Sequence, residues 1–387
     1  MENNEKKIKR IGIDARFYGP VGKGLGRYTQ EIVDRVIELD KDNEYVVFLR
    51  QENFFNFNST NSKVKKVLAD VRWYTLAEQI MMPYYISKEK IDLMHYPHFN
   101  VPIFSSVPFV VTIHDLILVR YPTRRASTLN LFTYWIKNFA YKCVIRSAVK
   151  KAKKIIAVSE FTKKDLIDLF LIKNEKIQVT YEGVADSING GHDDDKKVIL
   201  GYNIHSPYLL YVGNVYPHKN IEGLFKIFPK IKEKFPEISL VLVGKEDYFY
   251  QRLKKIASSL ISYKSIIFAG YVPDKELESF YRQASLYVFP SLYEGFGLPP
   301  LEAMAKGLPV VSSDRGSMKE ILGDAVKYFD PENEEDMITK ILQVLSDNEL
   351  RNDLVSKGYE QVKKFSWEKC AKETLLIYTQ ILNNGKN

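Results

Sequence analysis

Short apolar runs alternate along the chain with longer segments that mix apolar and charged positions. The short runs are rich in Val, Ile, Leu and Phe, which is typical of strands buried on both faces. The longer segments are typical of helices, so the repeated alternation predicts an α/β protein with parallel sheets covered by helices. The predicted strands are Lys9–Ile13, Tyr45–Leu49, Val64–Leu68, Ile91–His95, Phe109–Ile113, Ile155–Val158, Ile177–Thr180, Tyr208–Val212, Leu240–Val243, Ile266–Phe268, Leu286–Phe289, Val310–Val311 and Val326–Phe329, and the longest helices are expected over 27–39 and 126–149.

The alternation is interrupted at Asp186–Lys197 by a polar, glycine-containing stretch without periodicity, which is typical of a domain linker. The chain has 387 residues, which is too long for one typical core and suits two α/β domains. We therefore predict one domain over residues 1–190 and a second domain over residues 198–365. The remaining segment, 366–387, is predicted to form a helix.

The composition, with 45% hydrophobic and 27% charged residues, is that of an ordinary globular protein. No apolar run reaches the ~18–20 residues of a membrane span, and Met1–Arg10 lacks the apolar centre of a secretory signal. Cys143 and Cys370 lie far apart and outside any CxxC spacing, so neither a disulfide framework nor a zinc site is indicated. These features predict a cytoplasmic protein.

The net charge of +8 is unevenly distributed, because the stretch from Leu116 to Ser159 contains no Asp or Glu. Aromatic and aliphatic residues are interleaved with its basic residues. One interpretation is an ordinary helix with a solvated basic side and a core side; the other is peripheral binding to an anionic membrane on its inner, cytoplasmic face. No motif supports nucleic-acid binding. The basic residues are Arg120, Arg124, Arg125, Lys137, Lys142, Arg146, Lys150, Lys151, Lys153 and Lys154.

The segment Pro290–Pro309 contains the strongest pattern for ligand binding. It follows a predicted strand, and Gly295 and Gly297 allow a turn in which the backbone can approach a ligand closely. Two prolines then suit the first turn of a helix, where no amide donor is required. The amides of 296–298 are therefore expected at a helix N-terminus, which favours a diphosphate.

Two glutamates accompany this turn. Glu294 precedes it, and Glu302 follows eight positions later in the predicted helix. Carboxylates accept hydrogen bonds from hydroxyl groups, which are plentiful on hexose and ribose. Alternatively, either glutamate could serve only as an acid near the helix N-terminus, where the dipole favours negative charge.

A further glycine turn follows the first strand in each of the two predicted domains. In Gly19–Tyr28, Gly22, Gly24 and Gly26 permit a tight turn, but the spacing is not GxGxxG and does not imply NAD. In Gly213–Asn220, Lys219 at the opening of the next helix could neutralise a diphosphate. His114 ends another strand, at the edge of a parallel sheet where ligands bind in open α/β folds.

These motifs resemble retaining glycosyltransferase family 4, which has a Glu–seven residues–Glu motif and the GT-B fold, and the resemblance covers nearly the whole chain. It implies two Rossmann-like parallel-sheet domains facing across a cleft. The first would be the acceptor side, the second would bind a nucleoside-diphosphate sugar, and the C-terminal helix would cross back to the first. Tyr181–Val184 resembles the family's turn at the end of the first domain.

The resemblance also implies a role for each candidate residue. Glu294 would hold hexose hydroxyls, Lys219 the diphosphate, and His114 would orient the sugar. Many relatives carry an arginine where this chain has Asn214, which leaves more of the phosphate charge to Lys219. The implied catalytic set is Glu294, His114 and Lys219, and the implied donor-binding set is Gly24, Gly26, Gly213, Asn214, Tyr271, Val272, Gly295, Phe296, Gly297, Leu298 and Glu302.

The glycine loop and the GNxxPHKN pattern are similar to bacterial mannosyltransferases of the family, which makes GDP-mannose the first candidate donor. The acceptor would be a glycan, a glycolipid or a similar molecule of cell-envelope or polysaccharide biosynthesis. No Asp-x-Asp motif suggests a bound metal ion, and no cofactor is expected beyond the donor. The alternatives are a nucleotide-sugar epimerase or inverting transferase of the same fold, a non-catalytic sugar-nucleotide-binding protein of membrane assembly, and a Rossmann oxidoreductase.

Overall fold

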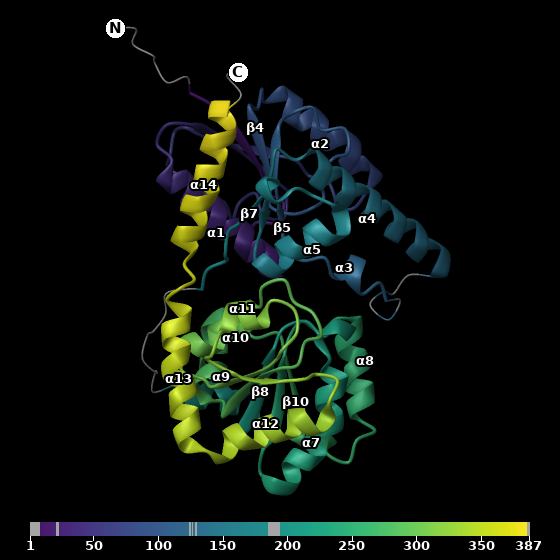
Figure 1. Ribbon diagram of the computed structural model, residues 1–387, viewed down its shortest axis with the longest axis vertical. Helices are drawn as coiled ribbons and strands as arrows, with labels where there is room; N and C mark the ends of the chain where they lie inside the picture. Colours follow the sequence, from purple (N-terminus) through teal and green to yellow (C-terminus); the bar gives the residue numbers. More distant parts are fainter. Residues whose placement is uncertain are drawn as a thin grey trace. The chain divides into compact units, whose positions relative to one another are not determined.

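The computed structural model describes residues 8–20, 23–123, 125, 127, 130–184 and 194–384. These residues divide into two compact units, each built around one sheet (Figure 1). Unit 1 contains the described residues of 1–116, 131–183 and 366–387, and unit 2 contains those of 117–130 and 184–365. None of the described helices combines the length and the apolar character needed to cross a lipid bilayer.

Unit 1 is centred on a seven-stranded sheet in the order β3-β2-β1-β4-β5-β6-β7, with every pair parallel. Its strands read as continuous apolar runs because helices cover both faces; Ile11 and Ile13, for example, are fully buried. The strands are β1 (Arg10–Asp14), β2 (Glu44–Leu49), β3 (Val64–Leu68), β4 (Leu93–Tyr96), β5 (Phe109–Ile113), β6 (Lys154–Ala157) and β7 (Ile177–Val179).

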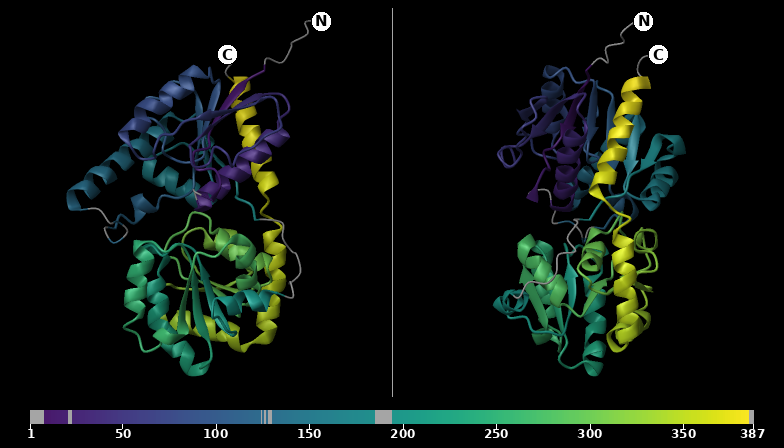
Figure 2. Two further views of the ribbon diagram at one scale, coloured as in Figure 1. Left: turned by 180° about the vertical axis from the view of Figure 1, so that it is seen from behind. Right: turned by 90° about the vertical axis from the view of Figure 1, so that its left-hand side faces the viewer.

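The helices of unit 1 lie on both sides of this sheet, with α1 and α14 packed together on one side and α2 and α4 on the other (Figure 1, Figure 2). Gly183 permits the chain to approach α14, since a Cβ atom there would lie 2.1 Å from the Trp367 amide nitrogen. The helices are α1 (Lys23–Leu39), α2 (Leu76–Lys88), α4 (Leu131–Lys151), α5 (Glu160–Phe170), η3 (Asn174–Lys176) and α14 (Trp367–Asn384).

Unit 2 is centred on a six-stranded parallel sheet in the order β10-β9-β8-β11-β12-β13. Helices again cover both faces, with α7 and α8 on one side and α10 and α13 on the other (Figure 1). The strands are β8 (Tyr208–Val212), β9 (Ser239–Val243), β10 (Ile266–Gly270), β11 (Leu286–Phe289), β12 (Val310–Ser313) and β13 (Lys327–Phe329). The helices are α3 (Ile117–Arg120), α6 (Asp195–Gly201), η4 (Pro217–Lys219), α7 (Ile221–Lys234), α8 (Tyr248–Ala257), η5 (Tyr263–Ser265), α9 (Asp274–Gln283), α10 (Leu298–Ala305), α11 (Met318–Leu322), α12 (Glu334–Ser346) and α13 (Asn348–Val362).

The strand order reverses at the same place in each unit, between β1 and β4 in unit 1 and between β8 and β11 in unit 2. At such a reversal the loops that leave the two strands diverge to opposite faces and open a crevice at the carboxyl edge of the sheet. The predicted fold, two Rossmann-like parallel-sheet domains, is confirmed in its architecture.

Several predicted boundaries are wrong. Helix α1 begins at Lys23 rather than at residue 27, and α4 begins at Leu131 rather than at 126. The predicted linker ends too late, because α6 begins at Asp195, whose carboxylate accepts hydrogen bonds from α9. Residues 186–193 of that linker, and Gly22 of the first glycine loop, lie outside the described residues.

The described residues of 117–130 belong to unit 2 rather than to the first domain. Arg125 donates hydrogen bonds to both carboxylate oxygens of Glu222, and the Tyr121 ring contacts the Tyr293 ring at 5.6 Å. The basic stretch 116–159 is therefore divided between the two units. Arg124, one of its ten basic residues, lies outside the described residues.

Candidate functional site

The candidate residues of unit 2 gather at its strand-order reversal. The loop after β8 contains Gly213, Asn214 and Lys219, and the loop after β11 contains Glu294. The two loops are tied together by a backbone hydrogen bond that the amide of Leu292 donates to the carbonyl of His218 at 2.7 Å. The fold therefore brings together two motifs that are far apart in the sequence, at the place where open α/β sheets bind ligands.

Lys219 and Glu294 form an ion pair, with 2.5 Å between Lys219 Nζ and Glu294 Oε1. Their side chains are only 14% and 9% exposed, so both charges are largely removed from bulk water. Lys219 Nζ also lies 5.8 Å from the centre of the Phe289 ring, which adds a favourable cation–π contact. A cation and a hydrogen-bond acceptor thus share one buried position at the edge of the sheet.

The loop that contains Glu294 is held by two residues that were not selected from the sequence. Ser317 Oγ donates hydrogen bonds to the carbonyls of Glu294 and Phe296 at 3.3 and 3.0 Å. Gly316 has a φ of +66°, and a Cβ atom there would lie 2.7 Å from the Glu294 carbonyl oxygen. Gly316 and Ser317 therefore position the backbone of Glu294. They lie between β12 and α11, and only the tertiary structure brings that connection next to Glu294.

Helix α10 begins at Leu298, and Gly297 caps it with a φ of +95°. A Cβ atom on Gly297 would lie 2.6 Å from Met318 Cε, so glycine is needed there for space as well as for conformation. The first amides of a helix have no intrahelical acceptor, which fits the anion site expected at 296–298. The Phe296 side chain itself is buried against the Phe365 ring and points into the core of the unit.

Glu302 lies in α10, and its Oε2 accepts a hydrogen bond of 3.0 Å from the hydroxyl of Tyr281. The pKa of the Tyr287 hydroxyl lies well above its ordinary value. Burial raises it first, and the negative charges of Glu302 and Glu294 raise it further. Both carboxylates are therefore close enough to the Tyr287 hydroxyl to influence it.

Asn214 offers an unused polar atom at this site. Its Oδ1 is buried and has no hydrogen-bond partner among the described residues, and the same holds for Ser291 Oγ in the loop after β11. The backbone carbonyl of Asn214 is held by the Tyr211 hydroxyl at 2.6 Å, and Gly213 before it has a φ of +145°. Buried polar atoms without partners are costly, so these two atoms mark the loops after β8 and β11 as prepared for a polar ligand.

The two donor-binding candidates in the turn after β10, Tyr271 and Val272, differ in how exposed their side chains are. Tyr271 is exposed, whereas Val272 is almost fully buried. Only Tyr271 therefore presents its side chain at the surface of the unit. The helix that follows, α9, begins at Asp274, and Pro273 occupies its N-cap position.

In unit 1, His114 directly follows β5 and is held on both ring nitrogens. Nδ1 lies 2.9 Å from Glu182 Oε1, and Nε2 lies 2.9 Å from the carbonyl oxygen of Pro97. A carboxylate and a carbonyl oxygen are both acceptors, so this geometry favours a proton on each ring nitrogen and a charged ring. Burial alone would lower the pKa of His114, but the hydrogen bond and charge of Glu182, with the Pro97 carbonyl, raise it.

A second buried histidine completes this region and was not selected from the sequence. His95 Nε2 lies 2.9 Å from Thr112 Oγ1, and its Nδ1 lies 2.5 Å from the hydroxyl of Tyr378 in α14. Burial, and then the charge of His114, lower the pKa of His95 to about 3, so His95 is neutral. Only the return of α14 to unit 1 brings Tyr378 to β4.

The glycine motif Gly19–Tyr28 allows the start of α1 to pack closely on the loop that precedes it. Gly24 and Gly26 lie inside the first turns of α1, not in a loop, which corrects the expected tight turn. A Cβ atom on Gly26 would lie 2.0 Å from the carbonyl oxygen of Gly19, whereas one on Gly24 would meet nothing within 4 Å. The close backbone approach that Gly26 permits is therefore to Gly19 in the preceding loop.

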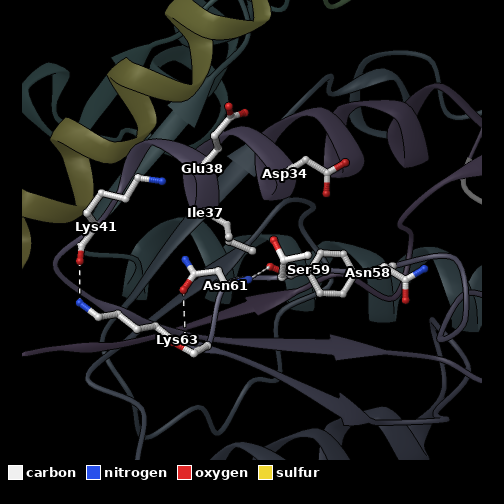
Figure 3. Close-up of a pocket in the computed structure, with 11 residues that line it drawn as sticks. Asp34, Ile37, Glu38, Lys41, Asn58, Ser59, Asn61 and Lys63 are labelled. Carbon is white, nitrogen blue, oxygen red and sulfur yellow. Dashed lines mark hydrogen bonds between the residues drawn. The ribbon is translucent and has the colours of Figure 1, made fainter.

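Two surface pockets differ in whether they lie near the candidate residues. One of about 670 Å³ in unit 1 is lined by α1 residues such as Asp34 and Glu38, by Lys41 after that helix and by residues 57–63 (Figure 3), and it contains no candidate residue. One of about 130 Å³ in unit 2 is lined in part by Val215 and Leu292, in the loops after β8 and β11. Among the described residues, no group of three or more His, Cys, Asp or Glu is arranged to hold a metal ion.

Comparisons with known proteins agree with this architecture. Residues 22–187 match the family model described as Glycosyltransferase Family 4, and residues 193–361 match the model described as Glycosyl transferases group 1. O-antigen chain mannosyltransferase B of Escherichia coli is 30% identical over 92% of this chain and 95% of its own length. O-antigen chain mannosyltransferase RfbU of Salmonella typhimurium is 26% identical over 81% of this chain and 80% of its own length.

The sucrose-phosphate synthase of Thermosynechococcus elongatus has the same fold, with a TM-score of 0.76, 19% identity and coverage of 97% of this chain and 100% of its own. The predicted enzyme class, a hexosyltransferase, is confirmed by the family models and the mannosyltransferase relatives. From the two matched family models and the near full-length relative, this chain belongs to the glycosyltransferases of family 4.

Proposed function

We propose that this glycosyltransferase transfers mannose, with retention of anomeric configuration, from GDP-mannose to a glycan or lipid-linked acceptor in the synthesis of a cell-surface polysaccharide. Two relatives that align over most of the chain are O-antigen chain mannosyltransferases, which supports both the sugar and the class of acceptor. The protein would act in the cytoplasm, peripherally bound to the inner face of the membrane.

The observation that supports this proposal most strongly is the buried pair of Lys219 and Glu294 at the strand-order reversal of unit 2. In the reaction the bond between the sugar and the diphosphate breaks, and negative charge grows on the leaving phosphate. Lys219 and the amides of 296–298 would stabilise that charge without reorganising, which is the largest source of catalysis in such sites. Glu294 would accept hydrogen bonds from the hexose.

The nucleoside would lie along α10 and the turn after β10. Glu302 would accept hydrogen bonds from the ribose, with its carboxylate oriented by the Tyr281 hydroxyl. Tyr271, exposed at the start of the turn, would contact the base. The partnerless Oδ1 of Asn214 would accept a hydrogen bond from a hydroxyl group of the nucleotide sugar. The phosphate charge that an arginine balances in many relatives would fall to Lys219.

Retention by double displacement needs a carboxylate that is free to attack the anomeric carbon. Glu294 Oε1 is engaged by the Lys219 ammonium, which suits a hydroxyl acceptor better than a nucleophile. We therefore favour attack from the face of the leaving phosphate. In this scheme His114 acts as a fixed positive charge in unit 1, because both its ring nitrogens already donate to Glu182 and Pro97.

A donor screen tests the proposal. A ligand that binds the folded protein raises its free energy of unfolding by mass action, by about 2.7 kcal/mol at a hundred times the dissociation constant. The melting temperature rises with it. We expect GDP-mannose to stabilise the protein more than UDP- and ADP-sugars, and the product with an acceptor glycan to be the α-anomer by NMR. Stabilisation by no nucleotide sugar would refute the donor site, and stabilisation by UDP-sugars alone would refute GDP-mannose.

A further inference from the structure

Helix α4 in unit 1 exposes a continuous apolar stripe. Phe132, Trp135, Ile136 and Phe139 follow one another at intervals of three, one and three residues, so they lie on one helical face. Their exposed fractions are 76%, 61%, 53% and 71%. Single exposed apolar residues are normal on proteins, but a contiguous group of large ones marks a surface that binds something.

Helix α2 exposes a second stripe that the sequence did not reveal. Leu76, Ile80 and Tyr84 recur at intervals of four residues and are 85%, 71% and 49% exposed. The opposite face of α2 is buried through Met82 and Ile86. Helix α2 is therefore apolar on both sides, although only one side packs on unit 1.

Helices α2 and α4, which carry the two stripes, cover the same side of the sheet of unit 1 (Figure 1, Figure 2). The loop between β4 and β5 joins them: the amide of Ile103 donates to Gln79 Oε1 of α2 at 2.8 Å, and Lys151 Nζ of α4 donates to the Ile103 carbonyl at 2.7 Å. Phe104, next in this loop, is 80% exposed. We call the two stripes together with Phe104 the α2–α4 face.

The charges of the α2–α4 face have one sign. Residues 131–159 contain no Asp or Glu, and the α4 residues Lys137, Arg146 and Lys150 are exposed. The one acidic residue of α2, Glu78, is buried in an ion pair with Arg16. Exposed apolar side chains rimmed by cations, with no exposed carboxylate on either helix, match the interface of an anionic lipid bilayer.

We propose that the α2–α4 face docks on an anionic membrane, with the apolar stripes inserted among the lipids and the cations of α4 at the headgroups. The proposal deepens the proposed function, since it names a lipid surface as a partner of an enzyme whose acceptor would be made there. A second copy of the chain is a poorer occupant, because pairing two such faces would bring like charges together.

Vesicle sedimentation tests the docking surface directly. The wild-type protein should bind vesicles of phosphatidylglycerol and phosphatidylcholine, bind pure phosphatidylcholine far less, and dissociate when salt screens the headgroups. Trp135→Ser/Phe139→Ser on α4 and Leu76→Ser/Ile80→Ser on α2 should each lower the partition coefficient by at least about tenfold. The matched control is Leu376→Ser/Ile261→Ser, which removes exposed apolar residues from α14 and from unit 2.

A second readout places Trp135 in the lipid. Vesicles of brominated phosphatidylglycerol should quench part of the wild-type tryptophan emission, and the conservative variant Trp135→Phe should lose that quenching while Trp73 and Trp367 remain. Equal vesicle binding by the stripe and control variants would overturn the proposal. So would stripe variants that only shift the wild type from dimer to monomer by ultracentrifugation, which would show that a second copy covers the face.

These measurements are independent of catalysis. If the donor screen fails while the stripe variants lose vesicle binding, the proposed function is wrong and the docking surface stands. If the stripe variants bind vesicles like the wild type while GDP-mannose still stabilises the protein, the docking surface is wrong and the donor site stands. The melting temperature of each variant shows that a loss of binding does not come from unfolding.

Discussion

The pair of Lys219 and Glu294 can be divided experimentally into a structural part and a catalytic part. Removing one partner of a buried ion pair leaves the other charge uncompensated and costs about 3–5 kcal/mol. Glu294 is 9% exposed and retains slight contact with water, so Lys219→Met should cost about 3 kcal/mol, at the lower end of that range. In a unit of this size, that loss corresponds to a fall in melting temperature of roughly 6–12 °C.

The double variant Lys219→Met/Glu294→Gln should recover most of this stability, because replacing a whole buried pair by neutral groups is often close to neutral. Turnover should not recover. If the ammonium stabilises the leaving diphosphate and the carboxylate holds the hexose, Lys219→Met, Glu294→Gln and the double variant should each lose at least about a hundredfold in turnover. Calorimetry measures the stability, and release of nucleoside diphosphate measures the turnover.

An exposed pair in the same unit provides the control. Lys230 and Glu335 are 54% and 74% exposed, so Lys230→Met should leave both the melting temperature and turnover close to those of the wild type. A double variant that is stable and nearly as active as the wild type would show that the Lys219–Glu294 pair is only structural. A melting temperature unchanged by Lys219→Met would refute the argument from burial.

Two further predictions concern residues that hold the candidate site. Glu182→Gln removes the partner that raises the pKa of His114. The stabilisation that Glu182 contributes is complete below the unfolded histidine pKa of about 6.5 and is lost as pH rises through the raised folded pKa. The melting temperature of the variant should therefore differ more from that of the wild type at pH 5.5 than at pH 9. The exposed Glu175→Gln is its control, and a deficit that grows with pH would contradict the assignment. Gly316→Ala should destabilise unit 2 by about 1–3 kcal/mol and lower turnover, because its Cβ would displace the Glu294 backbone. Gly201→Ala, where a Cβ meets nothing within 4 Å, should do neither, and equal melting temperatures and rates for the two variants would refute this role.

The α/β architecture follows from local pattern. Strands such as β5 and β11 are apolar along their whole length because both faces are buried, and that signal needs no knowledge of distant residues. The loop before α10 was also recognisable, since Gly297 and the prolines after it are each required by the geometry of a helix start. Boundaries were less certain: glycine propensity argues against a helix at Gly24 and Gly26, yet packing of α1 against the Gly19 loop extends the helix over both.

Other features of the candidate site depend on contacts that no local pattern encodes. Lys219 meets Glu294 across 75 positions and His114 meets Glu182 across 68, because parallel strands deliver their carboxyl ends to one edge of a sheet. The same holds for the α2–α4 face, since periodicity shows that a helix has an apolar side but not whether that side is covered. The sequence by itself determined the strands, the fold class and the types of residue available for chemistry, because these depend on neighbours along the chain. Only the tertiary structure decided which charges pair and which apolar sides remain exposed, because pairing and exposure depend on the neighbours that each side chain meets in space.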